Sequence, residues 1–245
     1  MLKKEAIFLD LDNTILDSKG AYNYSLEKLS HHWKKIYAEN NFLNHFEEKK
    51  KIVTGRLRGM PTHRSRILVF KELIDERELS LHSEKILYFE RKYFQYFVEY
   101  IKLFKRTNKK KYKKLFSILD EFSRTKNIYL LTNESLKTQL IKTNNTLPAS
   151  LNINLITSEE VGKEKLSTEY FSYVLQRANV DSRHSSMIGD SFEDDICGAI
   201  NSGVRAIQVL SVFGEDSLSE GIYKDTKFVI YGNVLQALEN FQRTQ

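Results

Sequence analysis

The chain has 245 residues, of which 41% are hydrophobic and 12% aromatic. A chain of this length and composition can bury one large core, or a core with a smaller insert, and is neither disordered nor a short disulfide-bonded scaffold. Its net charge of +6 fits an anionic partner, but charge alone does not separate a nucleic acid from a phosphorylated small molecule.

Cysteine and histidine offer no framework for a disulfide or a structural zinc site. The single cysteine, Cys197, cannot form an intramolecular disulfide, and no histidines stand beside it with metal-ligand spacing. A reducing cytoplasm is therefore the expected location. Asp10 and Asp12 interrupt the apolar run near the N-terminus, which argues against a signal peptide. No uninterrupted apolar stretch reaches the roughly 18 residues needed to span a bilayer. We therefore expect no membrane-spanning segment and no association with a membrane.

Short apolar runs alternate with helical segments along the chain, a pattern typical of a parallel sheet covered by helices on both faces. Each run is short and bounded by polar residues, so we predict one strand for each. The predicted strands are residues 6–9, 128–131, 153–156, 186–188, 204–210 and 228–230. The predicted fold class is therefore α/β, with a Rossmann-like parallel sheet as the core.

More than a hundred residues separate the first two predicted strands and contain no comparable run. The apolar side chains in this interval follow helical spacing. They are Leu26, Leu29, Trp33 and Ile36 in one group, and Ile86, Phe89, Tyr93, Phe97 and Phe104 in another. We interpret the aromatic stripe as the inner face of a helical bundle rather than a cofactor site. The prediction is a helical domain at residues 18–106, inserted into a core formed by residues 1–17 and 107–245.

Acidic residues follow two of the predicted strands. Asp10 and Asp12 come after the first strand, and residues 189–195 (GDSFEDD) come after the fourth. The carboxyl ends of parallel strands meet at one edge, where open α/β sheets bind ligands. Carboxylates gathered there raise one another's pKa unless a cation neutralises them, and oxygen ligands without Cys or His favour Mg²⁺. Either cluster alone could be a helix-capping loop, but two clusters after two strands favour a metal site.

Anion-binding groups follow two further strands. Thr132 and Asn133 provide a hydroxyl, an amide and backbone N–H groups at the start of a predicted helix. After residues 153–156, a lysine such as Lys165 could reach the same edge and cancel negative charge. Taken singly, these residues could be a helix cap and a surface lysine. Their common position after parallel strands favours a phosphate site.

Together, these motifs resemble those of the haloacid dehalogenase superfamily, and the resemblance covers nearly the whole predicted core. In chain order the motifs are DLDNT at residues 10–14, TN at 132–133, a lysine at Lys165 and GDSFEDD at 189–195. The residues after the last motif, 195–204, also resemble this superfamily. The helical insertion resembles the C1-type cap of the phosphoglycolate phosphatase and nucleotidase-like branch. The resemblance thus implies a Rossmann-like catalytic core carrying a helical cap domain.

The resemblance implies a chemistry for the first two carboxylates. Asp10 would attack phosphorus and form an aspartyl-phosphate, which water then hydrolyses. Asp12 would protonate the leaving oxygen and later take a proton from the attacking water. Dehalogenases of the superfamily lack an aspartate two residues after the nucleophile, because a halide needs no proton. The presence of Asp12 therefore favours phosphate chemistry.

The resemblance also implies a Mg²⁺ site. The ion would be held by the Asp10 side chain, the Asp12 backbone carbonyl and Asp190, and would shield the nucleophile from the charge of the phosphate. An outer carboxylate would complete the site. Asp195 aligns better with the residues that follow it, although Asp194 could serve instead.

Three residues would bind the transferring phosphoryl oxygens, according to the same resemblance: Thr132, the backbone around Asn133, and Lys165. The lysine of this motif is commonly followed by proline, whereas Lys165 is followed by leucine. Lys163 is therefore an alternative. The spacing to residues 170–171 favours Lys165.

Residues 54–66 (TGRLRGMPTHRSR) are predicted to form a loop, because they contain two glycines and one of only two prolines. The position resembles the specificity loop of such caps, and arginine suits bidentate recognition of carboxylate or phosphate. Arg58 is the first candidate for a substrate contact. Arg56, Arg64 and Arg66 are alternatives, and each of these arginines could equally be a solvated surface residue.

We expect a Mg²⁺-dependent phosphatase acting on a small phosphorylated metabolite, either a nucleoside monophosphate or a sugar or organic-acid phosphate. A phosphomutase of the same superfamily, or a nucleic-acid-binding protein with little turnover, is the alternative. Residues 20–114 carry 23 basic and 11 acidic side chains (net +12), whereas residues 115–245 carry 12 and 17 (net −5). This division fits a basic cap over an anionic substrate on an acidic core, and it disfavours nucleic acid.

Overall fold

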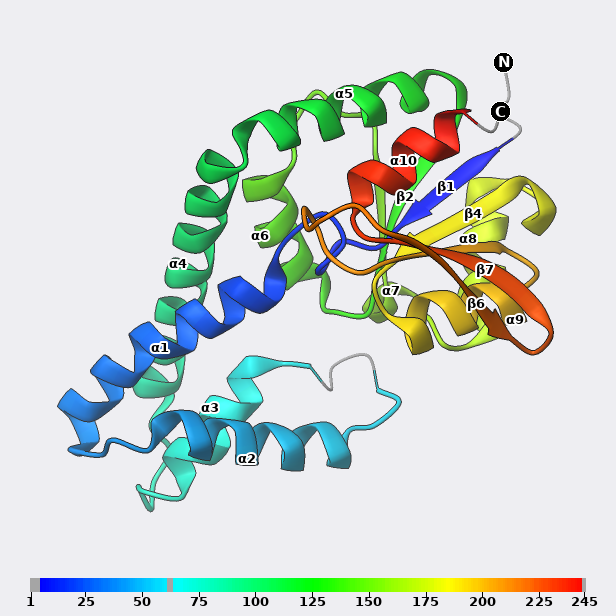
Figure 1. The fold of residues 1–245 in the computed structure, drawn as a ribbon. Helices are drawn as coiled ribbons and strands as arrows, with labels where there is room; N and C mark the ends of the chain where they lie inside the picture. Colours follow the sequence, from blue (N-terminus) through cyan, green and yellow to red (C-terminus); the bar gives the residue numbers. More distant parts are fainter. Residues whose placement is uncertain (1–4, 61–63, 244–245) are drawn as a thin grey trace.

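The first strand lies in the interior of the sheet, and all of its side chains are apolar. Strand β1 (Ala6–Leu9) is buried along its whole length, with Ile7 and Leu9 facing one side and Ala6 and Phe8 the other. It pairs in parallel with β2 (Asn127–Thr132) and with β4 (Ser185–Gly189). The structure is a computed structural model that describes residues 5–60 and 64–243 (Figure 1).

Seven strands form one sheet in the order β3-β2-β1-β4-β5-β7-β6. The remaining strands are β3 (Asn154–Thr157), β5 (Arg205–Val209), β6 (Leu218–Tyr223) and β7 (Thr226–Tyr231). All neighbours pair in parallel except β6, which runs antiparallel to β7. The six predicted strands are therefore present within two residues of their predicted limits, and the predicted α/β fold class is confirmed.

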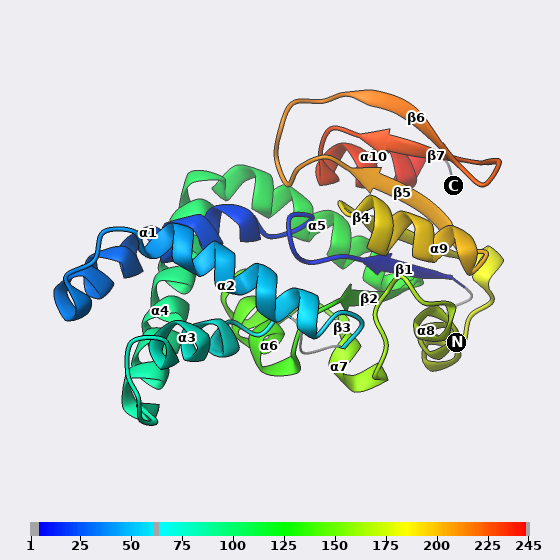
Figure 2. The same cartoon turned by 90° about the horizontal axis from the view of Figure 1, so that it is seen from below.

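Helices cover both faces of the sheet, as Figure 2 shows. On one face, α5 (Lys109–Thr125) and α10 (Val234–Arg243) pack against the face that includes Ile7 and Leu9. On the other, α8 (Thr168–Ala178) and α9 (Gly198–Asn201) pack against the face that includes Phe8. Two further helices, α6 (Leu136–Thr146) and α7 (Ser158–Val161), begin just after the carboxyl ends of β2 and β3. The loops at this edge of the sheet are left uncovered by these helices and carry the site described below.

Four helices from the long interval after β1 form a second layer, here called the helical layer (Figure 1). They are α1 (Ser18–Tyr37), α2 (Phe42–Arg56), α3 (Arg66–Asp75) and α4 (Ser83–Thr107). Trp33 is fully buried among aromatic rings of this layer, including Phe42 and Phe89. In Figure 1, α4 of the layer lies beside α6 of the core. The limits of the predicted inserted domain, residues 18 and 106, stay a prediction.

The helical spacing predicted for the layer agrees with burial at most positions. Leu26, Leu29 and Trp33 are buried, whereas Ile36, in the last turn of α1, is 42% exposed. Among the described residues, none of the helices combines the length and apolar character needed to cross a bilayer.

Two local predictions need correction. Strand β6 is absent from the predicted strands, because its sequence (LSEGIY) contains no continuous apolar run; in the structure most of its residues are exposed. It joins β7 through Lys224 and Asp225, both at positive φ, in a tight hairpin that lacks the usual glycine signal. The predicted loop at 54–66 begins later than expected, because α2 continues to Arg56. Residues 61–63 of that loop lie outside the described residues.

The packing of α1 predicts a contrast between two of its aliphatic residues. Leu29→Ala should lower the free energy of unfolding by about 2–5 kcal/mol, because Leu29 is fully buried. Ile36→Ala should cost less than about 1 kcal/mol, because Ile36 is 42% exposed and loses little burial on truncation. Urea unfolding followed by the fluorescence of Trp33, the single tryptophan, measures both. Equal losses in the two variants would show that the described packing of α1 is wrong.

Candidate active site

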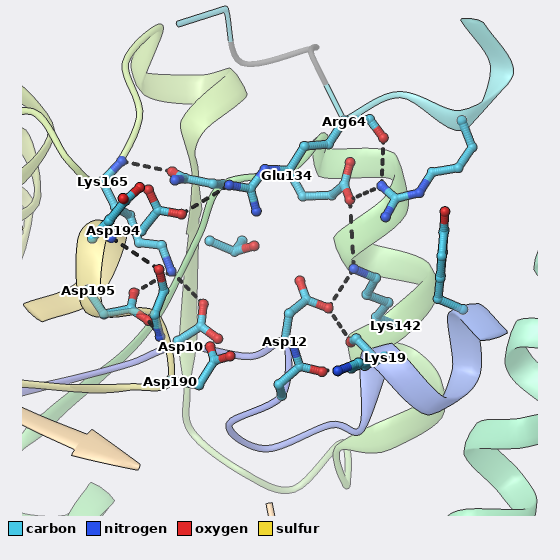
Figure 3. A pocket seen from close by; sticks show the side chains of 18 of the residues that line it. Asp10, Asp12, Lys19, Arg64, Glu134, Lys142, Lys165, Asp190, Asp194 and Asp195 are labelled. Carbon is cyan, nitrogen blue, oxygen red and sulfur yellow. Dashed lines mark hydrogen bonds and ion pairs between the residues drawn. The ribbon is translucent and has the colours of Figure 1, made fainter. Parts of the chain in front are cut away.

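The end of β1 turns sharply and places two carboxylates at the edge of the sheet. Asp10 is still held to the sheet, because its backbone N–H donates to the Ile188 carbonyl at 2.9 Å. The next residues leave the sheet in a tight loop, in which Asn13 adopts a left-handed conformation (φ 59°). Asparagine tolerates this conformation better than most residues. Asp10 and Asp12 therefore both line the cavity above the sheet (Figure 3).

A buried lysine joins two carboxylates beneath this cavity. The Nζ atom of Lys165 lies 2.5 Å from Oδ1 of Asp10 and 2.6 Å from Oδ1 of Asp195. All three side chains are almost completely buried. Burial opposes the charged form of Lys165, but the two carboxylates outweigh it and raise the pKa of the lysine. Lys163 is exposed, so the predicted alternative to Lys165 lies away from this cluster.

Three carboxylates lie close enough together to hold a cation. Oxygen atoms of Asp10, Asp190 and Asp195 lie within 4.8 Å of one another. Burial raises the pKa of Asp10 to about 7, with added repulsion from Asp195 and only partial relief from Lys165. Burial and the Asp10 charge likewise raise the pKa of Asp190 to about 7. Within the described part of the chain, Oδ2 of Asp10 is buried and has no hydrogen-bond partner. These properties favour a divalent cation with oxygen ligands at this cluster.

The loop after β4 selects which of its aspartates joins this group. Residues Phe192–Cys197 form a wide helical turn that directs Asp195 inward, where its Oδ2 accepts from the Ser191 backbone N–H at 3.1 Å. A Cβ atom at Gly189 would overlap the Asp195 carboxylate, so glycine is required there. Asp194 points elsewhere and pairs with Arg64 at 3.0 Å. Asp195, not Asp194, therefore lies with Asp10 and Asp190.

The segment after β2 contributes polar groups from the opposite side of the cluster. Thr132 and Asn133 are both buried, and both line the cavity. The Asn133 side-chain oxygen accepts from the Lys165 backbone N–H at 2.8 Å, which ties this segment to the loop after β3. The Lys165 ammonium also donates to the Leu131 carbonyl at 3.2 Å. An anion seated above Thr132 would therefore meet hydroxyl, amide and ammonium donors together.

Asp12 is held by helix α6 rather than by the carboxylate cluster. Lys142 donates to Oδ1 of Asp12 at 2.6 Å, and Gln139 donates to Oδ2 at 2.9 Å. The Ser18 hydroxyl also donates to Oδ1. Burial would raise the pKa of Asp12, but Lys142 and these hydrogen bonds hold it well below its usual value. The described arrangement therefore stabilises the carboxylate form of Asp12.

The cavity above these groups has a volume of about 460 Å³ and is bounded by the helical layer. Lys50 and Arg66 of this layer line it, together with Arg64 from the segment before α3 and the rings of Tyr22 and Phe97. Arg58 is exposed in the turn after α2 and is not among the described residues that line the cavity. The structure therefore brings two of the alternative arginines to the site and does not bring the first candidate.

The predicted core residues, in contrast, come together at one cavity. Those lining it are Asp10, Asp12, Thr132, Asn133, Lys165, Asp190 and Asp195. Sequence reasoning missed Gln139, Lys142 and Glu134, which also surround Asp12 or line the cavity. The available signal was the spacing of Gln139 and Lys142, three residues apart on one face of the helix that follows Thr132.

Comparisons with known proteins agree on one family. The family model for haloacid dehalogenase-like hydrolases matches residues 4–203. The chain is 41% identical over 61 residues to glyceraldehyde 3-phosphate phosphatase of Methanothermobacter thermautotrophicus, covering 25% of this chain and 27% of that protein. It is 45% identical over 51 residues to pyrimidine 5′-nucleotidase YjjG of Escherichia coli, covering 20% of this chain and 23% of that protein. The matched segments thus span about a quarter of these curated relatives.

Solved structures share the fold over most of the chain. A phosphatase of the same family from Thermococcus onnurineus superposes with a TM-score of 0.61 at 18% identity, covering 97% of each chain. YfnB from Bacillus subtilis, solved bound to magnesium, superposes with a TM-score of 0.59 at 22% identity, covering 84% of this chain and 89% of that one. At these identities the similarity establishes the fold.

The carboxylate cluster predicts a pH-dependent response to Mg²⁺. Because the folded pKa of Asp10 and Asp190 is about 7, the metal-free folded chain keeps protons that the unfolded chain releases near pH 4. The stability of the metal-free protein should therefore fall as pH rises from about 4 to about 7. Saturating MgCl₂ should raise the melting temperature by about 5 °C or more at about pH 8, and by less at about pH 5.5, where protons compete.

Thermal melts with MgCl₂ or a chelator test this expectation. Asp190→Asn should remove most of the Mg²⁺-dependent shift. Asp120→Asn is the matched control, because Asp120 is a half-exposed aspartate on α5 that pairs with Arg124. A Mg²⁺ shift that is equal at both pH values, or unchanged in Asp190→Asn, would contradict a cation site at this cluster.

Proposed function

The chain belongs to the haloacid dehalogenase-like hydrolase family, and from this membership we propose that it is a Mg²⁺-dependent phosphatase. It would hydrolyse a small phosphorylated metabolite through an aspartyl-phosphate on Asp10. The observation that carries the proposal is the buried Asp10 carboxylate, which has one oxygen paired with Lys165 and, among the described residues, no hydrogen-bond partner for the other. The phosphatase names of the curated relatives support the same reaction class.

The residues present fit a magnesium ion. Asp10, Asp190 and Asp195 offer hard oxygen ligands within a small volume, and their raised pKa values indicate negative charge that is not fully neutralised. The backbone carbonyl of Asp12 is a proposed further ligand. When bound, the ion would supply Lewis-acid neutralisation of charge on the nucleophile and the phosphate.

In the first chemical step, an Asp10 oxygen attacks phosphorus. A bond forms between that oxygen and phosphorus, while the bond from phosphorus to the leaving oxygen breaks. The leaving oxygen takes a proton from the carboxyl group of Asp12, so the alcohol departs neutral. This step requires Asp12 to be protonated when substrate is bound, whereas Lys142 and Gln139 favour its carboxylate form in the described structure. Lys165 holds Asp10 in place for this attack through the 2.5 Å contact to Oδ1.

In the second step, water attacks phosphorus and displaces Asp10. The water gives its proton to the Asp12 carboxylate, the bond from phosphorus to the Asp10 oxygen breaks, and inorganic phosphate leaves. The contacts from Lys142 and Gln139 favour the carboxylate form of Asp12 that this step requires. Each group thereby returns to its starting protonation state.

Donors around the cavity bind the phosphoryl oxygens. Thr132, Asn133 and Lys165 converge from two loops on one side, where negative charge spreads over those oxygens in the transition state. They are fixed before substrate arrives, since Asn133 is hydrogen-bonded to the Lys165 backbone. Such preorganised donors need no rearrangement during the reaction.

The size and charge of the cavity support a small anionic substrate. A volume of about 460 Å³ is in the range of sites for small molecules. Lys50, Arg64 and Arg66 line its upper side, opposite the carboxylates. A nucleoside monophosphate or a sugar or organic-acid phosphate meets these requirements, and the basic helical layer over an acidic core disfavours nucleic acid.

The proposal predicts Mg²⁺-dependent release of inorganic phosphate from an aryl phosphate and from members of a panel of phosphorylated metabolites. Asp10→Asn keeps the size of the side chain but removes the nucleophile, so turnover should fall about a thousandfold or more. Chelation of the metal should abolish turnover. Full activity in Asp10→Asn would refute the proposed function. Isomerised substrate without net phosphate release would indicate a phosphomutase instead.

A further inference from the structure

We propose that Lys142 is a positioning residue for Asp12, and that Glu134 together with Arg66 of the helical layer holds Lys142 in place. Contact between the helical layer and the core would then set the position of the group that transfers protons. This inference rests on the proposed function, because it assigns a task to residues around Asp12. It rests on four side chains of alternating charge that follow one another from the helical layer to the active site.

The first link is the complete occupation of the Asp12 carboxylate. Oδ1 accepts from Lys142 at 2.6 Å, and Oδ2 accepts from Gln139 at 2.9 Å. Both donors come from α6, three residues apart and therefore on one face of the helix. Gln139 also donates to the Thr132 hydroxyl at 2.8 Å, which ties the same face to the proposed phosphate site. Helix α6 therefore fixes Asp12 relative to the proposed phosphate site at Thr132.

The second link is the burial of Lys142. Only 5% of its side chain is exposed, and its ammonium lies 5.7 Å from the centre of the Phe97 ring of α4. A buried ammonium group requires anionic partners to offset its lost hydration. Two carboxylates supply them, Asp12 at 2.6 Å and Glu134 at 3.9 Å. Lys142 is therefore held between the catalytic loop and the segment after β2.

The third link is the shared pairing of Glu134 with two cations. Its carboxylate is also almost buried, and its Oε2 atom lies 2.7 Å from the Arg66 guanidinium and 3.9 Å from the Lys142 ammonium. Arg66 makes the shorter contact with Glu134, and Lys142 makes its own short contact with Asp12, at 2.6 Å. Loss of Arg66 would leave Glu134 as a buried carboxylate with Lys142 beside it, and would draw the lysine away from Asp12.

Arg66 belongs to the helical layer and is itself well placed. It is the first residue of α3, and its guanidinium donates to the Arg64 carbonyl at 2.6 Å as well as to Glu134. It also lies over the Tyr22 ring of α1 at 5.7 Å. Figure 3 shows Glu134, Lys142 and Asp12 in a line across the cavity. The chain of contacts therefore connects the helical layer directly to Asp12.

The test measures kcat/KM for a series of aryl phosphates whose leaving groups differ in acidity. A poor leaving group needs the proton from Asp12, whereas a dinitrophenol leaves without it. Lys142→Met should lower kcat/KM about tenfold or more for phenyl phosphate and about threefold or less for dinitrophenyl phosphate. Glu134→Gln and Arg66→Met should also lower kcat/KM more for phenyl phosphate than for dinitrophenyl phosphate. These two variants decide the question if Lys142→Met does not fold.

A double-mutant cycle tests whether Arg66 acts through Lys142, since the structure places Glu134 between them. With phenyl phosphate as substrate, the double variant Arg66→Met/Lys142→Met should lose less kcat/KM than the product of the fold-losses in the two single variants. Lys137→Met is the matched control, because Lys137 also lies on α6 and pairs with Glu90 of α4, at 3.3 Å, outside the cavity. It should leave the dependence on the leaving group unchanged.

The outcomes separate this inference from the proposed function. If the wild-type protein hydrolyses the aryl phosphates and Lys142→Met lowers kcat/KM for all of them by the same factor, Lys142 does not position Asp12. If the losses in Arg66→Met and Lys142→Met multiply, the helical layer does not act through Lys142. If wild-type protein hydrolyses no member of the series with Mg²⁺ present, the proposed function itself fails.

Discussion

The structure depends on one electrostatic constraint, the gathering of three carboxylates at the edge of a parallel sheet, two of which are buried against a single lysine. Asp10, Asp190 and Asp195 come from the ends of two adjacent strands, and Lys165 reaches them from a third loop. Their mutual repulsion would destabilise the fold without an opposing charge. Three local features bring these charges together. They are the tight turn after β1, the absence of a side chain at Gly189, and the hydrogen bond from the Lys165 backbone N–H to the Asn133 side chain.

A second set of charges surrounds Asp12 and has a different organisation. Here each carboxylate has a nearby cation, and the cations come from α6 and from the helical layer. The cluster around Asp10 thus keeps an excess of negative charge suited to a cation, whereas the set around Asp12 is nearly neutral. This separation within one cavity fits two tasks, attack on phosphorus by one aspartate and proton transfer by the other.

The sequence predicts those parts of the site that lie next to strand ends. Asp10, Thr132 and Asp190 are found because each follows a short apolar run, and parallel strands end at one edge. Lys142 and Glu134 are missed because their relation to Asp12 depends on how α6 and the segment before it pack beside the loop after β1, more than a hundred residues away along the chain. Arg58 is a plausible ligand by residue type alone. Helix α2 and the following turn place it outside the cavity, and Arg66 lies inside.

The covalent state of Asp10 during turnover tests the central claim most directly. Asp12→Asn should slow hydrolysis of the phosphoenzyme, so that rapid quenching with substrate and Mg²⁺ traps the acyl phosphate. Borohydride reduces an acyl phosphate to the alcohol, and peptide mass spectrometry then identifies the residue that carried it. The account predicts homoserine at position 10. Turnover of the same substrate with an unmodified aspartate at position 10, or with the reduced side chain found at another residue, would contradict it.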